Sequence, residues 1–283
     1  MENSSEKPPK RKRGRPRSTF GDGSVETLQS VERALAVLTT VSQLERTTLS
    51  DLSLSMGIPT ATAHKILKTF QKCRYMSFDE DTQEWMIGIE AYRTGSSFLN
   101  QSNLTEAGRK VMRILVKETG ETANLAVYDR FEVVFIGQVE TSNPIRAFFP
   151  AGSRTSMHAS GAGKAILSAM AENQVRDLLE LGGLERFTEH TIISPASLTG
   201  DLASARELGW SLDHEERFLG MSCIGGVIFD SNEQPLAAVS ISGPSSRFTK
   251  SKVAELGTVV ARAASKITEQ IGGRSPKEWP RSV

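Results

Sequence analysis

Residues 60–72 hold the polar side chains whose chemistry is easiest to interpret. Ala63, Ile66, Leu67 and Phe70 follow the i, i+3, i+4, i+7 spacing of a buried helical stripe, which leaves threonine, histidine and lysine side chains on the outer face. Threonine and histidine can bond base edges in a DNA major groove, and lysine can bind phosphates. An ordinary solvated helix face has the same pattern, so both interpretations stay open. The candidate DNA-binding residues of this helix are Thr60, Thr62, His64, Lys65 and Lys68.

A shorter helix is predicted just before this one. Thr48 is placed to cap it, and Asp51 stands three residues later, at the spacing of a capping box. Gly57 suits the left-handed geometry that ends a helix, and Pro59 suits the first turn of the next. Two short helices that meet at a sharp turn predict a helix-turn-helix, whose second helix lies in the major groove.

Flanking segments extend the pair to a winged helix. Residues 74–78 and 84–87 predict two strands around the turn 79–82. The tip of this hairpin is acidic, so we expect it to brace the second helix rather than to insert between phosphates. Upstream, four apolar residues at helical spacing predict a third helix that packs against the pair: Val31, Ala34, Leu35 and Leu38.

The first 17 residues form a separate basic segment. They hold seven Lys or Arg and two Asp or Glu, a net charge of +5, whereas the whole chain carries +1 and the remainder therefore −4. With almost no apolar residue, this segment is expected to be disordered. Arg13-Gly14-Arg15-Pro16 resembles an AT-hook, in which Arg13 and Arg15 would enter the minor groove of A·T-rich DNA. A generic phosphate-binding or solubilising tail fits equally well.

Length and composition indicate a cytoplasmic protein with more than one domain. The chain of 283 residues is longer than a winged helix of roughly 70 residues requires. The sequence shows neither an apolar run of membrane-spanning length nor a secretory signal. Cys73 and Cys223 are far apart in sequence, which favours reduced thiols. Cys73, near the end of the second helix, is expected to pack in the interior.

The remaining chain predicts an α+β domain with an antiparallel sheet, because strand pairs joined by hairpins stand between helices. Strands are expected at residues 122–128, 132–139, 145–149, 224–229 and 236–242. Helices are expected at residues 89–101, 105–117, 162–170, 172–181, 202–208 and 251–271.

Residues 160–163 are the candidate binding site of this second domain. Ser160-Gly161-Ala162-Gly163 stands just before a predicted helix, where free N–H groups without large side chains can bind a small carboxylate or phosphate. Close packing is the alternative reason for such small residues. Ser240 and Ser242 share one face of a predicted strand. Paired serines can instead bond local backbone.

The motifs of the chain together resemble the IclR-type transcriptional regulators. The resemblance covers nearly the whole chain and is carried by 28–35 (LQSVERAL), Gly57-Ile58-Pro59, 62–67 (TAHKIL) and 158–165 (HASGAGKA). Residues 213–216 (DHEE), 220–224 (GMSCI) and 241–247 (ISGPSSR) are similar to the glyoxylate-responsive group of this family. Many relatives have Lys or Ser followed by Ser where this chain has Thr60-Ala61, so base preference is not transferred.

The resemblance implies an N-terminal winged helix-turn-helix, a linker helix and a C-terminal GAF-like effector domain. It implies an operator in double-stranded DNA, a homodimer or homotetramer, and no cofactor. The implied effector is a small oxo-acid, glyoxylate first, with pyruvate, glycolate or a ureide or purine-catabolism metabolite as alternatives. The expected organisation is a disordered basic tail (1–20), the winged helix (21–88), the linker helix (89–102), the effector domain (103–274) and a flexible C-terminus (275–283).

The effector-binding residues that the resemblance implies are Gly161, Ala162, Asp213, Cys223, Ser240 and Ser242. The amides of Gly161 and Ala162 would hold a carboxylate. Asp213 would accept hydrogen bonds from the hydroxyls of a hydrated aldehyde, and Cys223 would close a compact pocket. An inert buried thiol is the alternative for Cys223.

Enzyme motifs fail on inspection, so no catalytic residue is assigned. Gly161-Ala162-Gly163-Lys164 ends like a phosphate-binding loop, but His158 stands where that loop requires glycine and Ala165 where it requires Ser or Thr. The segment 220–224 begins like a nucleophile elbow but ends in Ile224 instead of glycine. The histidines follow no zinc spacing, so no metal is expected. A small-molecule hydrolase, or a sensor without DNA activity, remains the rival class.

Overall fold

The computed structural model describes residues 27–100 and 104–280, without the side chains of residues 97–100. The predicted basic tail, with Arg13 and Arg15, lies outside the described residues. The chain forms two compact units, Met1–Thr94 and Gly95–Val283. The boundary falls inside helix α4 (Ile89–Asn100). Each unit is described by itself.

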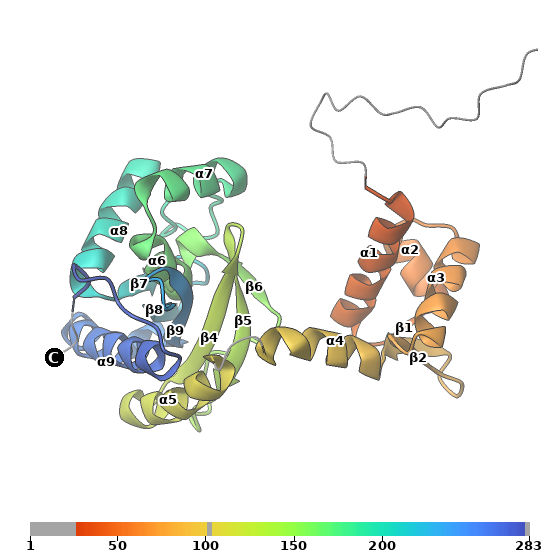
Figure 1. Ribbon diagram of the computed structural model, residues 1–283, viewed down its shortest axis with the longest axis horizontal. Helices are drawn as coiled ribbons and strands as arrows, with labels where there is room; N and C mark the ends of the chain where they lie inside the picture. Colours follow the sequence, from red (N-terminus) through yellow and green to blue (C-terminus); the bar gives the residue numbers. More distant parts are fainter. Residues whose placement is uncertain (1–26, 101–103, 281–283) are drawn as a thin grey trace, which may run out of the picture. The chain divides into compact units, whose positions relative to one another are not determined.

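The first unit is a winged helix (Figure 1). Its helices are α1 (Gln29–Leu44), α2 (Leu49–Met56) and α3 (Thr60–Lys72). An antiparallel sheet in the order β1-β3-β2 consists of β1 (Thr47–Thr48), β2 (Met76–Asp79) and β3 (Glu84–Ile87). Buried apolar residues from all three helices and from the hairpin form its core: Val37, Val41, Leu52, Leu67, Met76 and Trp85.

The helix signals around the turn act largely as predicted. The Thr48 Oγ1 atom accepts a hydrogen bond from the Asp51 backbone N–H at 3.2 Å, which caps α2. Gly57 ends α2 with φ +61°, a conformation that side chains rarely adopt. Pro59 differs from the prediction. It precedes α3 with ψ 135° instead of standing in its first turn.

The packing face predicted for α1 was wrong in part. Val37 and Val41 are the buried residues of this helix, whereas Val31 is 49% exposed and Leu35 55% exposed. The buried stripe of α1 lies about one turn further toward the C-terminus, where Val37 and Val41 pack into the core of the unit. The apolar residues at the start of α1 therefore remain on the surface.

Cys73 also differs from the prediction, because its side chain is exposed. The buried stripe of α3 ends at Phe70, and the helix ends at Lys72. Arg74 then takes a left-handed φ of +61° that turns the chain into β2. Cys73 therefore lies just after the end of α3, beyond the residues of this helix that pack into the core.

The second unit is a six-stranded antiparallel sheet covered by helices on both faces. The strands are β4 (Thr122–Asp129), β5 (Glu132–Val139), β6 (Arg154–Ser156), β7 (Ser211–His214), β8 (Met221–Phe229) and β9 (Pro235–Pro244). Their order in the sheet is β6-β5-β4-β9-β8-β7. The helices are α5 (Leu104–Thr119), α6 (Gly161–Ala169), α7 (Glu172–Gly182), α8 (Pro195–Leu208) and α9 (Lys250–Gln270), with short 3-10 turns at Met157–Ala159 and Ser245–Arg247.

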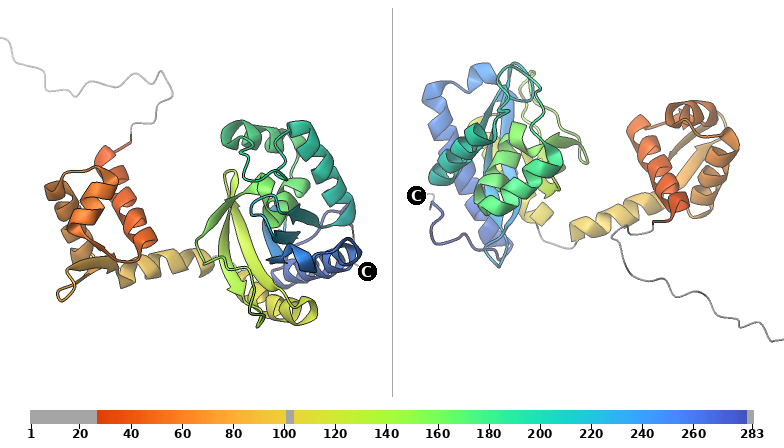
Figure 2. Two further views of the ribbon diagram at one scale, coloured as in Figure 1. Left: turned by 180° about the vertical axis from the view of Figure 1, so that it is seen from behind. Right: turned by 90° about the horizontal axis from the view of Figure 1, so that it is seen from above.

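Helices lie on both faces of the sheet (Figure 2), and an apolar core lies between the sheet and the helices on each face. Helices α5 and α9 cover the sheet face from which Ile224, Val239 and Ile241 project. Helices α6, α7 and α8 lie over the opposite face, where Ala126 and Val227 project. Successive strand residues point to opposite faces, so this alternation decides which side chains meet α6.

Three segments of the second unit differ from the sequence expectation. Residues 145–149 form no strand; Phe149 is half-buried in a loop and stacks on Phe135, with ring centroids 4.8 Å apart. The short strands β6 and β7 were not predicted. The expected flexible C-terminus is partly packed, since the Trp279 ring lies 5.2 Å from that of Phe229. In the part of the chain that the structure describes, no helix is long and apolar enough to cross a membrane.

Candidate functional site

The outer face of α3 carries the predicted DNA-binding side chains. Thr60, His64, Lys65 and Lys68 are exposed, and Thr62 is half-buried. The Thr60 hydroxyl lies 3.1 Å from the Ser53 hydroxyl of α2, which connects the two helices of the turn. The buried residues Ala63 and Leu67 set the rotation of α3 in the unit.

Lys68 has a second role that the sequence did not indicate. Its Nζ donates to Gln71 Oε1 at 3.0 Å and lies 5.5 Å from the centre of the Trp85 ring. The methylene stem of a lysine can cover apolar surface while its charge stays in water. Lys68 therefore also packs α3 against the hairpin.

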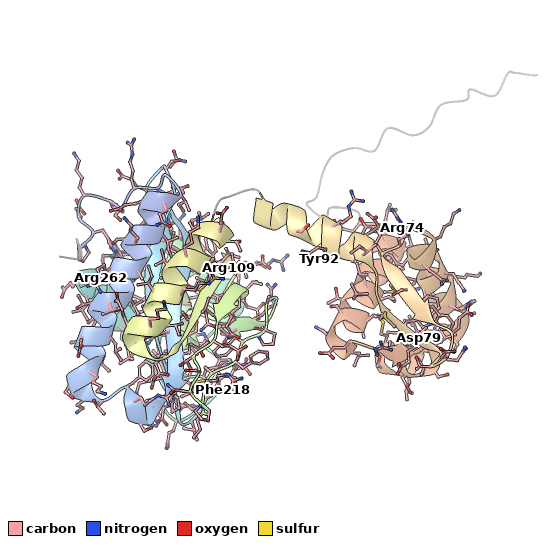
Figure 3. All side chains as sticks on the ribbon, turned by 90° about the horizontal axis from the view of Figure 1, so that it is seen from below. Arg74, Asp79, Tyr92, Arg109, Phe218 and Arg262 are labelled. Carbon is pink, nitrogen blue, oxygen red and sulfur yellow. The ribbon has the colours of Figure 1, made fainter. Side chains whose placement is uncertain are left out.

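The acidic hairpin is held from the other side by Arg46. The Arg46 Nη1 atom lies 3.3 Å from Asp79 Oδ2 and 3.4 Å from Glu84 Oε2. Figure 3 labels Asp79 on this hairpin, together with Arg74, which pairs with Glu90 of α4 at 2.8 Å. Ion pairs near the surface contribute little stability. The turn 79–82 at the tip of the hairpin contains three acidic residues and no basic one.

In the second unit, the start of α6 lies directly on strand β8. Ser160 caps the helix, because its Oγ accepts a hydrogen bond from the Gly163 N–H at 3.0 Å. A Cβ added at Gly161 would lie 2.8 Å from the carbonyl oxygen of Cys223, and one at Gly225 would lie 2.3 Å from that of Gly161. Only glycine at these positions allows this close approach of helix and strand.

Strand register brings the other predicted residues to the same face. Asp213 of β7 stands opposite Cys223 of β8, and Cys223 stands opposite Ser242 of β9. Ser240 stands opposite Gly225 and is fully buried, with no hydrogen-bond partner for its Oγ among the described residues. All four side chains therefore lie on the α6 side of the sheet.

A compact cavity opens at this point. It measures about 20 Å³ over the positions that the centre of a water molecule can occupy. Ala162, Asp213, Cys223 and Ser242 are in its wall, whereas Gly161 and Ser240 are not. Residues that the sequence analysis missed complete the wall: Phe135, Phe149, Thr155, Ala159, Ser160, Arg217, Phe218 and Met221.

The Asp213 carboxyl is electrostatically unusual. Burial, and then the nearby Glu216 carboxylate, raise its pKa to about 7, although Lys164 and the amides of Glu216 and Arg217 act in the opposite direction. The amide of Glu216 donates to Asp213 Oδ1 at 2.8 Å. Near neutral pH this carboxyl can therefore donate a hydrogen bond as well as accept one, which extends the role expected from the sequence.

Cys223 is a buried neutral thiol. Burial first, and the Asp213 carboxylate second, raise its pKa to about 11. A thiolate is the nucleophilic form of cysteine, so this environment suits a wall residue rather than a reactive one. Cys223 is buried and also lines the cavity, and its role toward an effector stays a prediction.

Lys164 has the largest fully buried side chain of the described residues, and the sequence analysis assigned it no role. Its side chain is fully buried, and its Nζ lies 2.6 Å from Glu216 Oε1 and 3.0 Å from Asp201 Oδ2. These contacts tie α6 to α8 and to the loop after β7. The motif contained this lysine, but no local signal indicated carboxylates 37 and 52 residues away along the chain.

Asn124 and Gln138 were also missed. Asn124 Nδ2 donates to Ser242 Oγ at 3.3 Å, and Gln138 Nε2 donates to Asn124 Oδ1 at 2.9 Å. This chain of amides fixes the Ser242 hydroxyl from the neighbouring strands. Within residues 27–100 and 104–280, no three His, Cys, Asp or Glu side chains are grouped as metal ligands.

Comparison with known proteins identifies both units. A family model described as "IclR helix-turn-helix domain" matches residues 30–80, and one described as "Bacterial transcriptional regulator IclR C-terminal" matches residues 96–269. The chain is similar in fold to the crystal structure of Thermotoga maritima IclR, with a TM-score of 0.72 and 27% identity, covering 86% of this chain and 98% of that one.

Two relatives extend the similarity over nearly the whole sequence. The chain is 39% identical over 265 residues to the transcriptional repressor IclR of Escherichia coli (strain K12), which covers 93% of this chain and 97% of the relative. It is 38% identical over 261 residues to the HTH-type transcriptional regulator BhcR of Paracoccus denitrificans (strain Pd 1222), which covers 91% and 94%. The chain therefore belongs to the IclR family of DNA-binding transcriptional regulators.

Proposed function

We propose that this regulator changes its DNA affinity when a small oxo-acid, glyoxylate first, binds in the cavity at the start of α6. One observation carries the proposal: a capped helix start and the side chains of Asp213, Cys223 and Ser242 surround the same compact space. N–H groups at a helix start attract anions, and the helix dipole adds to that attraction.

The two ends of glyoxylate match the two sides of this cavity. Its carboxylate would accept from the amides of Gly161 and Ala162, since Ser160 already occupies the amide of Gly163. Its aldehyde, or the hydrate, would face Asp213 and Cys223. A partly protonated Asp213 tolerates an anion beside it better than a fixed carboxylate would.

Cavity size supports a ligand of few atoms. The space of about 20 Å³ exceeds the roughly 10–15 Å³ that one water molecule needs on the same measure, but not by much. Pyruvate and glycolate differ from glyoxylate by one small group, so they remain close competitors. A ureide such as allantoin would require the wall to move.

For DNA, we propose that Thr60, Thr62, His64, Lys65 and Lys68 of α3 contact an operator, with Arg13 and Arg15 adding contacts from the basic tail. Helix-turn-helix proteins bind two half-sites through two copies, so a homodimer or homotetramer is part of the proposal. The exposed Val31 and Leu35 of α1 offer an apolar face for a second copy.

Calorimetric titration of the full-length protein with glyoxylate, pyruvate, glycolate, oxalate and allantoin tests the ligand. Ser242→Ala should weaken glyoxylate binding by about 1–3 kcal/mol, the range for a lost buried hydrogen bond. Ser245→Ala is the matched control, because Ser245 lies outside the cavity wall and bonds to Ser222. No heat with any of these acids would refute the proposal.

A further inference from the structure

Two residues of the cavity wall carry a buried hydrogen-bond donor without a partner in the described part of the chain. The Arg217 Nε atom and the Thr155 Oγ1 atom are both buried, and neither has a hydrogen-bond partner among the described residues. Both residues belong to the cavity wall. Buried donors without partners are rare in folded proteins, and a ligand is one established way to satisfy them.

Aromatic rings hold the Arg217 guanidinium, and no carboxylate of the described residues forms an ion pair with it. Its Cζ lies 3.7 Å from the centre of the Phe187 ring and 5.3 Å from that of Phe218. Phe218 is 46% exposed and lies at the surface of the second unit, where Figure 3 labels it. Stacking on aromatic rings fixes the plane of a guanidinium and leaves its N–H groups free to bind.

The loop that carries Arg217 is fixed as well. The Thr191 hydroxyl donates to the Glu216 carbonyl at 2.6 Å and accepts from the Phe187 amide at 3.0 Å. One threonine thus holds both the residue before Arg217 and the ring on which Arg217 stacks. The guanidinium is therefore positioned before any ligand arrives.

Lys164 is a buried cation that, unlike Arg217, forms ion pairs with carboxylates of the chain. Its ammonium has two carboxylates within 3.0 Å, from Glu216 and Asp201. Arg217 instead lies in the cavity wall. Asp213, the carboxyl residue of the same wall, already accepts a hydrogen bond from the Glu216 amide. A carboxylate of the ligand would accept the hydrogen bond that Arg217 Nε can donate, since guanidinium binds carboxylate through two parallel hydrogen bonds.

We propose that Arg217 and Thr155 form a second anion subsite, so that the cavity prefers a small acid with two carboxylates over one with a single carboxylate. One carboxylate would lie at the start of α6 and the other at Arg217, with Phe135, Phe149 and Met221 excluding water between them. This inference rests on the proposed function and narrows its ligand class to two- or three-carbon diacids. Glyoxylate fills only the first subsite.

Calorimetry on the full-length protein with glyoxylate, oxalate and oxomalonate tests the subsite. We expect wild type to bind the better diacid about tenfold more tightly than glyoxylate, as a charge-assisted hydrogen-bond pair allows. Arg217→Gln should abolish that preference, so that neither diacid binds more tightly than glyoxylate to this variant. Arg217→Lys, which keeps the charge but not the planar fork, should restore part of it. Arg186→Gln removes the same charge from an exposed neighbour of Phe187 and should behave like wild type.

The possible outcomes separate this inference from the proposed function. If wild type binds glyoxylate but binds neither diacid more tightly, the subsite is refuted and the proposed function stands. If Arg217→Gln weakens all three acids equally, with a lower melting temperature, Arg217 is structural and the subsite is refuted. If wild type binds no acid, both proposals fail.

Discussion

Three acidic side chains, those of Asp201, Asp213 and Glu216, surround one buried cation, the ammonium of Lys164. Burial alone would lower the pKa of Lys164, but the carboxylates of Glu216 and Asp201 outweigh it and raise that pKa, so the ammonium stays charged. Burial raises the pKa of Glu216, and its contact with Lys164 opposes the shift. Asp213 forms no ion pair with Lys164 among the described residues, and its pKa of about 7 lies near neutral pH. It is therefore the residue at which pH should act.

Our first prediction concerns pH and Asp213. The folded pKa of about 7 lies above the ordinary 3.8, so folding favours the protonated carboxyl. Its stabilising contribution is complete below about pH 4 and is lost as the pH rises through 7. Relative to Asp213→Asn, wild type should lose unfolding free energy on the order of a few kcal/mol between pH 4.5 and pH 8, because one pKa unit is about 1.4 kcal/mol.

Urea unfolding of both proteins at several pH values measures this difference. Asparagine keeps an oxygen for the Glu216 amide, and the other titrating groups are common to both proteins, so their contributions cancel. A difference between the two proteins that does not change with pH would contradict the assignment.

Among the elements, α3 is the one that we propose contacts the operator. Lys65→Ala and Lys68→Ala should each weaken operator binding and lower the salt slope of log K by about one unit, because each removes one phosphate contact. Fluorescence anisotropy over a salt series measures both quantities.

Two controls accompany this test. Lys68→Met keeps apolar cover over Trp85 and separates the charge from the packing. Lys110→Ala removes an exposed lysine of the second unit and should leave DNA binding unchanged. If both alanine variants keep the wild-type salt slope of log K, these lysines of α3 do not contact phosphates.

A glycine substitution tests the contact between α6 and β8. Gly225→Ala would place a Cβ 2.3 Å from the carbonyl oxygen of Gly161 and 2.7 Å from the amide of Ala162. We expect a loss of about 1–3 kcal/mol in stability, the range for overpacking, together with weaker glyoxylate binding. Gly200→Ala has nothing within 4 Å in the interior of α8, and should stabilise by about 0.5–1 kcal/mol. Equal unfolding midpoints in urea for the two variants would contradict the close approach.

Elements with strong local signals were predictable from the sequence, and those held by distant contacts were not. The Thr48 cap, the Gly57 turn and the stripe of α3 depend on residues a few positions apart, and the structure contains all three. Strand β7 has only four residues, and it exists because it pairs with β8. Arg217 and Phe218 were missed for the same reason: the loop after β7 brings them to a cavity whose other walls come from distant strands.

At the scale of the whole molecule, charge is distributed unevenly along the chain. The first 17 residues carry +5 and the rest −4. Deleting them should reduce operator affinity and flatten its salt dependence, because fewer counterions are released. Glyoxylate binding in the second unit should stay unchanged.

The flanking DNA tests how the tail binds. Minor-groove insertion by Arg13 and Arg15 predicts a larger loss on A·T-rich flanks than on G·C-rich ones. An equal loss on both leaves generic phosphate binding as the explanation. Wild-type affinity after the deletion would show that the tail contributes nothing to DNA binding.

The central claim is that an acid in the cavity of the second unit controls what the first unit binds. A ligand can shift DNA affinity only by binding one arrangement of the protein better than another. The direct measurement is operator affinity, by anisotropy on DNA from upstream of its own gene, with and without saturating glyoxylate, for wild type and for two variants of the cavity wall, Asp213→Ala and Ser242→Ala. We predict a several-fold shift in wild type, a smaller or absent shift in both variants, and equal affinity of all three without ligand. No shift in wild type, or the same shift in all three proteins, would contradict the account.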